Sequence, residues 1–249
     1  MFESGLVSVS FRSLEPKQIV KLCKENELSF VEWGSDVHAP CSDSARIDEI
    51  IELQKKYDIK CSSYGTYFKI GVNDVSELNG YIEAARALGT NILRLWCGDK
   101  NYTDMTAEER ERIISESRKA AKIAEARGVT LCMECHNKTF TNCLEGALEL
   151  MQSVNSNSFQ MYWQPNQFRT LDENIEYAEK IAEYVKVIHV FNWEGKNKYP
   201  LAEAIDIWQR YLSFFDGSQK LLLEFMPNGS PDSLGAETEA LDKIRSIFL

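Results

Sequence analysis

The residues best suited to chemistry in this chain stand at the ends of apolar runs that are typical of β-strands. Only three histidines occur, and each ends or closely follows such a run: His38, His136 and His189. Two further runs, 159–164 and 220–224, end in Gln164 and Glu224. Burying unpaired polar groups is costly. Acids, amides and imidazoles at the C-terminal ends of successive strands therefore indicate a metal or sugar site of the kind found in β/α barrels.

Strand alternation indicates which side chains share one face of these runs. The inward-pointing candidates are Glu32, Arg94, Trp96, Glu134, His136, Tyr162, Gln164, His189 and Glu224. Their oxygen and imidazole donors suit Mn²⁺, Mg²⁺, Co²⁺ or Zn²⁺. The carboxylates could also move a proton on a carbon next to a carbonyl, with the metal stabilising the enediolate oxygen. A single strand-end glutamate is more often an ion-pair partner, but three acids and two histidines in register favour a site.

Eight strand-like runs alternate with eight amphipathic runs. The predicted strands span 5–11, 29–33, 60–64, 92–97, 129–136, 159–164, 185–191 and 220–225. The predicted helices span 16–27, 46–57, 74–88, 107–127, 144–154, 172–184, 201–214 and 237–248. A doubly wound sheet usually has a glycine-rich turn after its first strand, and residues 11–16 contain no glycine. We therefore predict an α/β fold, a (β/α)8 TIM barrel, with residues 1–249 forming a single domain.

Composition excludes several other classes of protein. A net charge of −10 argues against nucleic acid as a partner, because phosphates are bound by lysine and arginine. No apolar stretch is long enough for a membrane-spanning helix, and the first residues lack a signal-peptide pattern. Seven cysteines without framework spacing indicate the reducing cytoplasm. Cys132 and Cys135 form a C-x-x-C, but strand alternation places them on opposite faces, which argues against a zinc or redox motif.

The order Glu134, Gln164, His189, Glu224 resembles the xylose isomerase-like TIM barrel family, the sugar phosphate isomerase/epimerase group. The resemblance covers essentially the whole chain. It implies one divalent metal ion (Mn, Mg, Co or Zn) held by these four residues, with Glu134 and Glu224 also forming the catalytic acid/base pair. The segment 134–137 resembles the E-x-H motif of the family, which makes His136 a contact of the substrate or of a ligand.

The chain departs from the family at Gln164. Members usually carry Asp there, with His three residues later, where this chain has Gln167. A Gln carbonyl can ligate a metal but brings no charge, so the ion is expected to bind weakly or to be absent. The basic residue that many epimerases place after the ligand His is not evident either. Lys196 and Lys198 are the nearby cations.

The site residues lead to three hypotheses about function. The first is a metal-dependent isomerase or epimerase acting on a small ketose, polyol or hydroxy-carbonyl compound. The second is a lyase that dehydrates a cyclic polyol ketone, as inosose dehydratase does, and the third is a sugar-binding barrel without turnover. Endonuclease IV-type barrels need more histidines and a basic face, which are missing here. Gly195 and Gly229 are isolated, so no glycine pair indicates a phosphate site after the last two strands, which favours an unphosphorylated substrate. The sequence is compatible with a homo-oligomer.

Eight residues are expected to contact the sugar-like substrate: Glu32, His38, Arg94, Trp96, His136, Gln167, Trp193 and Lys196. For His38, a purely structural place in the loop 36–40 is an equal alternative. For Trp96 and Trp193, packing at the core or rim is at least as good an interpretation as stacking on a sugar.

Overall fold

A computed structural model describes residues 2–248 and shows eight parallel strands closed into a barrel. Around the ring the strands follow the order β1-β10-β7-β6-β5-β4-β3-β2. Their bounds are Glu3–Val7 (β1), Phe30–Gly34 (β2), Lys60–Ile70 (β3), Ile92–Cys97 (β4), Thr130–Glu134 (β5), Phe159–Trp163 (β6), Val185–Val190 (β7) and Lys220–Leu223 (β10). The predicted (β/α)8 TIM barrel is confirmed.

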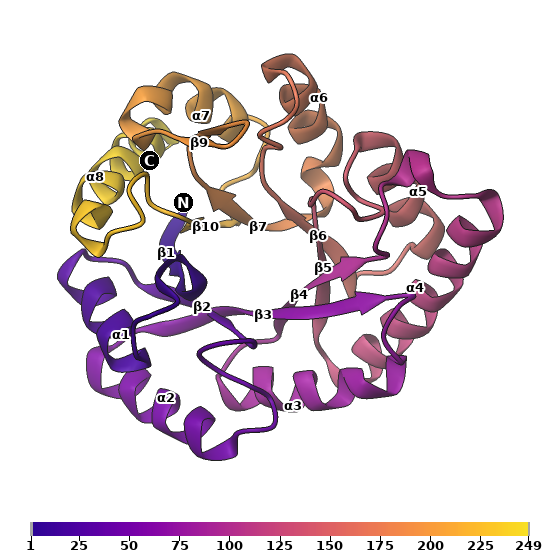
Figure 1. The fold of residues 1–249 in the computed structure, drawn as a ribbon, viewed down its shortest axis with the longest axis horizontal. Helices are drawn as coiled ribbons and strands as arrows, with labels where there is room; N and C mark the ends of the chain where they lie inside the picture. Colours follow the sequence, from indigo (N-terminus) through magenta and orange to yellow (C-terminus); the bar gives the residue numbers. More distant parts are fainter. Residues whose placement is uncertain (1, 249) are drawn as a thin grey trace.

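The helices form an outer ring, in chain order, around the strands (Figure 1). They span Pro16–Glu25 (α1), Ser44–Tyr57 (α2), Leu78–Ala87 (α3), Ala107–Arg127 (α4), Leu144–Val154 (α5), Leu171–Ile181 (α6), Ile205–Leu212 (α7) and Leu234–Arg245 (α8). Their ends follow local chemistry. For example, Thr106 and Glu109 form the predicted capping box of α4, and Gly128 ends that helix at φ 63°. Between residues 2 and 248, no helix combines the length and apolar composition needed to cross a membrane.

Two apolar layers hold the barrel together. The larger lies between strands and helices, and the smaller fills the barrel interior with residues such as Val7, Cys132 and Tyr162. Cys135 belongs to the outer layer, so the two cysteines of the C-x-x-C lie in different layers, as strand alternation predicts. Both are buried in apolar surroundings, which raise the pKa of each thiol to about 12.

Three differences from the predicted elements shape the mouth of the barrel. The first strand ends at Val7, and Ser8–Phe11 form a 3-10 helix whose first residue is held by hydrogen bonds of the Ser8 hydroxyl with Gly34 and His38. Strand β3 continues six residues past the predicted end at Tyr64, to Ile70. A short antiparallel hairpin of β8 (Trp193–Glu194) and β9 (Asn197–Lys198) follows β7 and was not predicted.

Candidate active site and metal centre

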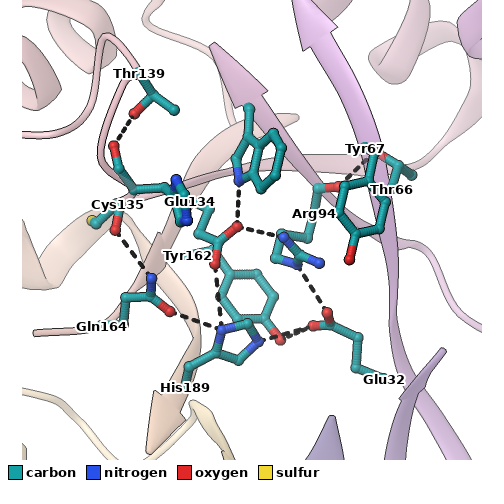
Figure 2. Close-up of polar contacts among 12 residues, drawn as sticks. Glu32, Thr66, Tyr67, Arg94, Glu134, Cys135, Thr139, Tyr162, Gln164 and His189 are labelled. Carbon is teal, nitrogen blue, oxygen red and sulfur yellow. Dashed lines mark hydrogen bonds and ion pairs between the residues drawn. The ribbon is translucent and has the colours of Figure 1, made fainter. Parts of the chain in front are cut away.

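Four side chains from neighbouring strands meet at the C-terminal end of the barrel. Glu134 ends β5, Gln164 follows β6, His189 lies in β7 and Glu224 follows β10. One ligand atom from each of Glu134, His189 and Glu224 can be chosen so that all three lie within 4.8 Å of one another. The Oε1 atom of Gln164 lies 2.9 Å from Nδ1 of His189 (Figure 2). The structure thus brings together the four residues that the sequence predicts as metal ligands.

The atoms around Nδ1 of His189 fit a cation. This nitrogen lies 2.9 Å from Oε1 of Gln164, 3.3 Å from Oε2 of Glu224 and 3.6 Å from Oε1 of Glu134. Three oxygen atoms and a nitrogen lone pair repel one another unless a positive charge lies among them. A divalent ion supplies that charge, and so does a proton on Nδ1. Burial alone would lower the pKa of His189, but the surrounding carboxylates raise it well above its ordinary value.

The amide of Gln164 has a defined orientation. Its Nε2 donates to the backbone carbonyl of Cys135 at 3.3 Å, which leaves Oε1 directed at His189. A glutamine can ligate a metal through its amide oxygen, and this oxygen points toward the centre of the site. The fixed amide therefore favours Gln164 as an oxygen donor.

Arg94 links two of the buried carboxylates (Figure 2). Its Nε donates to Oε1 of Glu32 at 2.9 Å, and its Nη1 donates to Oε2 of Glu134. The indole of Trp96 donates to the same Glu134 oxygen at 2.5 Å. Gly65 leaves space for this arrangement, since a Cβ there would stand 2.5 Å from Oε1 of Glu32. Burial would raise the pKa of Glu134, but Arg94 and His189 outweigh it and lower that pKa well below the ordinary range.

Glu32 lies beneath the site and not on its wall. It is fully buried, and its Oε2 accepts hydrogen bonds from Ser63 at 3.2 Å and from the Tyr162 hydroxyl. The same oxygen lies 3.2 Å from Nε2 of His189. Burial raises the pKa of Glu32, but Arg94 and His189 lower it to about 2. The sequence predicts that Glu32 contacts the substrate, but Glu32 does not line the cavity and instead supports His189 from below.

His38 does not line the cavity either. Its Nε2 lies 3.1 Å from the carbonyl oxygen of Leu14, which can only accept, so Nε2 carries the hydrogen. Nδ1 then accepts from the Ser8 hydroxyl at 3.0 Å, and the Ser8 oxygen accepts from the backbone N–H of Gly34. With both ring nitrogens bonded and 2% of its surface exposed, His38 connects loops. These contacts favour the structural alternative for His38.

A cavity of about 200 Å³ opens above the four converging side chains. Five predicted substrate contacts line it: Arg94, Trp96, His136, Gln167 and Trp193. Lys196 does not line it and lies exposed in the hairpin turn. Lys198 instead places its Nζ 4.7 Å from the ring centre of Trp193 and 4.9 Å from that of Phe225.

The sequence did not identify several wall residues, namely Val9, Tyr67, Cys135, Asn137, Asn166, Phe191 and Phe225. Phe191 and Phe225 follow His189 and Glu224 closely, so the strand-end rule could have found them. Tyr67 was missed because β3 is longer than predicted. The alternating apolar residues of 64–70 were an available signal.

Comparison with known proteins identifies the fold. A family model described as "Xylose isomerase-like TIM barrel" matches residues 20–232. The probable 3-DHS dehydratase AsbF of Bacillus anthracis superposes with a TM-score of 0.81 at 17% identity, over 97% of this chain and 98% of that one. The IolI protein with a zinc atom gives 0.78 at 16% identity, over 100% and 99% of the two chains.

A D-psicose 3-epimerase of Clostridium cellulolyticum H10, solved with D-tagatose, gives a TM-score of 0.71 at 14% identity, over 99% of each chain. At such identities the likeness concerns the fold. No sequence among curated proteins matches the chain.

Proposed function

The chain belongs to the xylose isomerase-like TIM barrel family, and on that basis we propose that it is a metal-dependent enzyme acting on a small sugar-like compound. The proposed reaction is an isomerisation or epimerisation by proton transfer on a carbon next to a carbonyl. The observation that carries the proposal is the cluster of Glu134, His189 and Glu224, whose donor atoms lie within 4.8 Å below an open cavity.

Glu134, Gln164, His189 and Glu224 would hold the ion. When bound, it would polarise the carbonyl oxygen of the substrate and make the neighbouring C–H more acidic. The solved structure of IolI with zinc supports such a centre in this fold.

The two glutamates are engaged differently, which assigns them different roles. Oε2 of Glu134 accepts from both Arg94 and Trp96, so it is held as a carboxylate and oriented as a ligand. For Glu224, His189 is the ion-pair partner found within the described residues. Glu224 lines the cavity and keeps acceptor capacity for a substrate proton. We therefore assign Glu224 as the main proton acceptor and Glu134 as the second member of the pair.

A dehydratase is the second candidate, since loss of water from a cyclic polyol ketone begins with the same proton abstraction. Both reaction types occur among the similar structures, which include an epimerase and a probable dehydratase. Isomerisation and epimerisation conserve mass, whereas dehydration forms a product with one water fewer.

The test is solvent deuterium exchange. Protein loaded with Mn²⁺ is incubated in D₂O with small ketoses and cyclic polyol ketones, and products are analysed by NMR and mass spectrometry. We expect deuterium next to the carbonyl with wild-type protein and none with Glu224→Gln or Glu134→Gln. The matched control is Glu194→Gln, which makes the same change at an exposed position of the hairpin and should preserve exchange. Metal-loaded protein that exchanges no compound would support a barrel that binds without turnover.

A further inference from the structure

Two groups of aromatic side chains face each other across the barrel mouth, and we propose that the substrate is a neutral polyhydroxylated ring bound flat between them. This inference rests on the proposed function, which supplies the substrate carbonyl next to which Glu224 would accept a proton. In the closed strand order, β10 lies opposite β4 and β7 lies opposite β3. Residues at these four strand ends therefore form opposing walls of one cavity.

The first wall, here called the aromatic panel, consists of Phe191, Trp193 and Phe225. The ring centres of Phe191 and Trp193 lie 5.0 Å apart, with 38° between the planes. Those of Trp193 and Phe225 lie 5.2 Å apart, with 32° between the planes. At these distances and angles the three rings pack obliquely against one another, so the panel is a stepped aromatic wall.

The opposite wall carries Tyr67, Trp96 and His136. Trp96 stacks on His136, with ring centres 4.9 Å apart and 27° between the planes. Tyr67 meets Trp96 edge-on at 5.3 Å. Since all three line the same cavity as the panel, a bound molecule has aromatic groups on both sides.

The backbone at Phe225 is held in a conformation that places its ring in the panel. Phe225 has a φ of +51°, which is unfavourable for a bulky residue. Its N–H donates to the Ser10 hydroxyl at 2.9 Å, a contact that fixes this conformation. Strained residues of this kind concentrate at ligand sites. The strain falls directly after Glu224, which supports a role for the ring in binding.

The charges of the wall favour a neutral ligand. The Nε and Nη1 atoms of Arg94 donate to Glu32 and Glu134, and within residues 2–248 no lysine lines the cavity. Glu134 and Glu224 both line it, so a phosphate group would meet two carboxylates. Lys69 and Lys198 lie over the rings of Trp96 and Trp193, but neither is among the residues that line the cavity. Neutral hydroxyls can instead be bound by amides such as Gln167.

The shape of the site favours a ring over an open chain. An aromatic face carries partial negative charge and attracts the weakly positive C–H hydrogens of a ring face. An open-chain polyol presents no permanent flat face, and binding must also immobilise its rotatable bonds. A cavity of about 200 Å³ has room for one small ring.

The experiment compares three probes by calorimetry with Mn²⁺-loaded protein: myo-inositol, sorbitol and myo-inositol 1-phosphate. The first two have equal numbers of carbons and hydroxyls and differ in ring closure. We expect myo-inositol to bind at least about tenfold more tightly than sorbitol and more tightly than its phosphate ester. Equal binding of ring and chain, tighter binding of the ester, or binding of none of the probes would overturn the inference.

Variants of the panel test where the ring binds. Trp193→Ala and Phe225→Leu should each weaken myo-inositol about tenfold and change sorbitol little, whereas Trp193→Phe should retain most of the affinity. The control is Phe168→Ala, a 61% exposed aromatic in the adjacent loop that does not line the cavity. Thermal denaturation verifies that each variant is folded. If folded Trp193→Ala and Phe225→Leu bind myo-inositol as tightly as the wild type does, the ring does not bind at the aromatic panel and the inference is wrong.

Failure of this inference is distinguishable from failure of the proposed function. If an open-chain ketose exchanges deuterium while myo-inositol does not bind, the ring inference is wrong and the proton-transfer function stands. If myo-inositol binds through the panel while no compound exchanges, the ring site stands and the enzymatic proposal is wrong.

Discussion

Nε2 of His189 lies 3.2 Å from Oε2 of Glu32, a buried carboxylate that can only accept. Nε2 therefore carries a hydrogen, and a metal that displaces the proton from Nδ1 would find the Nδ1 lone pair on the side of Gln164 and Glu224. Carboxylates in this position fix the tautomer and orientation of ligand histidines. Glu32 is thus a positioning residue that acts through His189.

We predict that Glu32→Gln weakens Mn²⁺ binding by about 10- to 100-fold, because its amide nitrogen would face the Nε2–H of His189 and the Tyr162 hydroxyl. Calorimetry measures the affinity, and long-range ¹H–¹⁵N NMR of the diamagnetic Zn²⁺-loaded protein reports which ring nitrogen of His189 carries the hydrogen. Three histidines make the assignment simple. The control is Glu237→Gln, a buried glutamate bonded to the backbone of Leu201, which should leave both readouts unchanged. If Glu32→Gln leaves the Mn²⁺ affinity and the His189 tautomer unaltered, Glu32 does not position His189.

Gln164→Asp should tighten Mn²⁺ binding, by about tenfold, because a charged oxygen attracts a hard cation more strongly than an amide carbonyl does. Asp is one methylene shorter and loses the bond to the Cys135 carbonyl, so the gain depends on its reach. Gln167→Asp is the matched control, with the same change on the cavity wall at a position that is not a proposed ligand. Equal or weaker binding by Gln164→Asp would mean that Gln164 does not ligate.

The fold and the four converging side chains followed from the sequence, because both depend on local patterns and barrel topology. Alternating apolar residues locate the strands, and a parallel barrel brings strand ends such as Glu134 and His189 together. No side-chain interaction needs to be known for either inference.

The cavity wall was harder to predict because tertiary contacts determine the conformations of the loops that form it. The hairpin that presents Trp193 is held by a 2.8 Å bond between the N–H of Gly195 and the carbonyl of Gln167, residues that are distant in sequence. Similarly, Glu32 satisfies the period-2 rule for the barrel interior. Only the contacts with Arg94 and His189 show that it lies below the cavity.

The positive φ of Phe225 predicts an unusual order of stabilities. Phe225→Gly and Phe225→Ala both lose the ring, but only alanine has to adopt φ +51° with a Cβ atom. We expect the Gly variant to be more stable than the Ala variant by about 1 kcal/mol in urea denaturation. At Phe191, which is not among the residues with positive φ, the Ala variant should be at least as stable as the Gly variant. The same order at both positions would contradict strain at Phe225.

The burial of His38 leads us to predict how the free energy of unfolding changes with pH. Burial lowers the pKa of its imidazole below the unfolded value of about 6.5, and partial compensation comes from the Leu14 carbonyl. Below that value the unfolded chain binds a proton that the folded protein does not, so stability is retained above about pH 6.5 and declines as pH falls toward the folded pKa.

The measurement is the free energy of unfolding between pH 8 and about pH 5 for wild type and His38→Gln. Glutamine has an amide that can donate to Leu14 but does not titrate in this range. We expect the wild type to lose stability more steeply below pH 6.5, with an excess slope of at most about 1.4 kcal/mol per pH unit, the value for one proton. The comparison isolates His38, because the other titrating groups, including His189, are present in both proteins. Parallel curves would mean that His38 titrates in the folded protein as it does in the unfolded chain, and that its bonds to Ser8 and Leu14 do not hold it neutral.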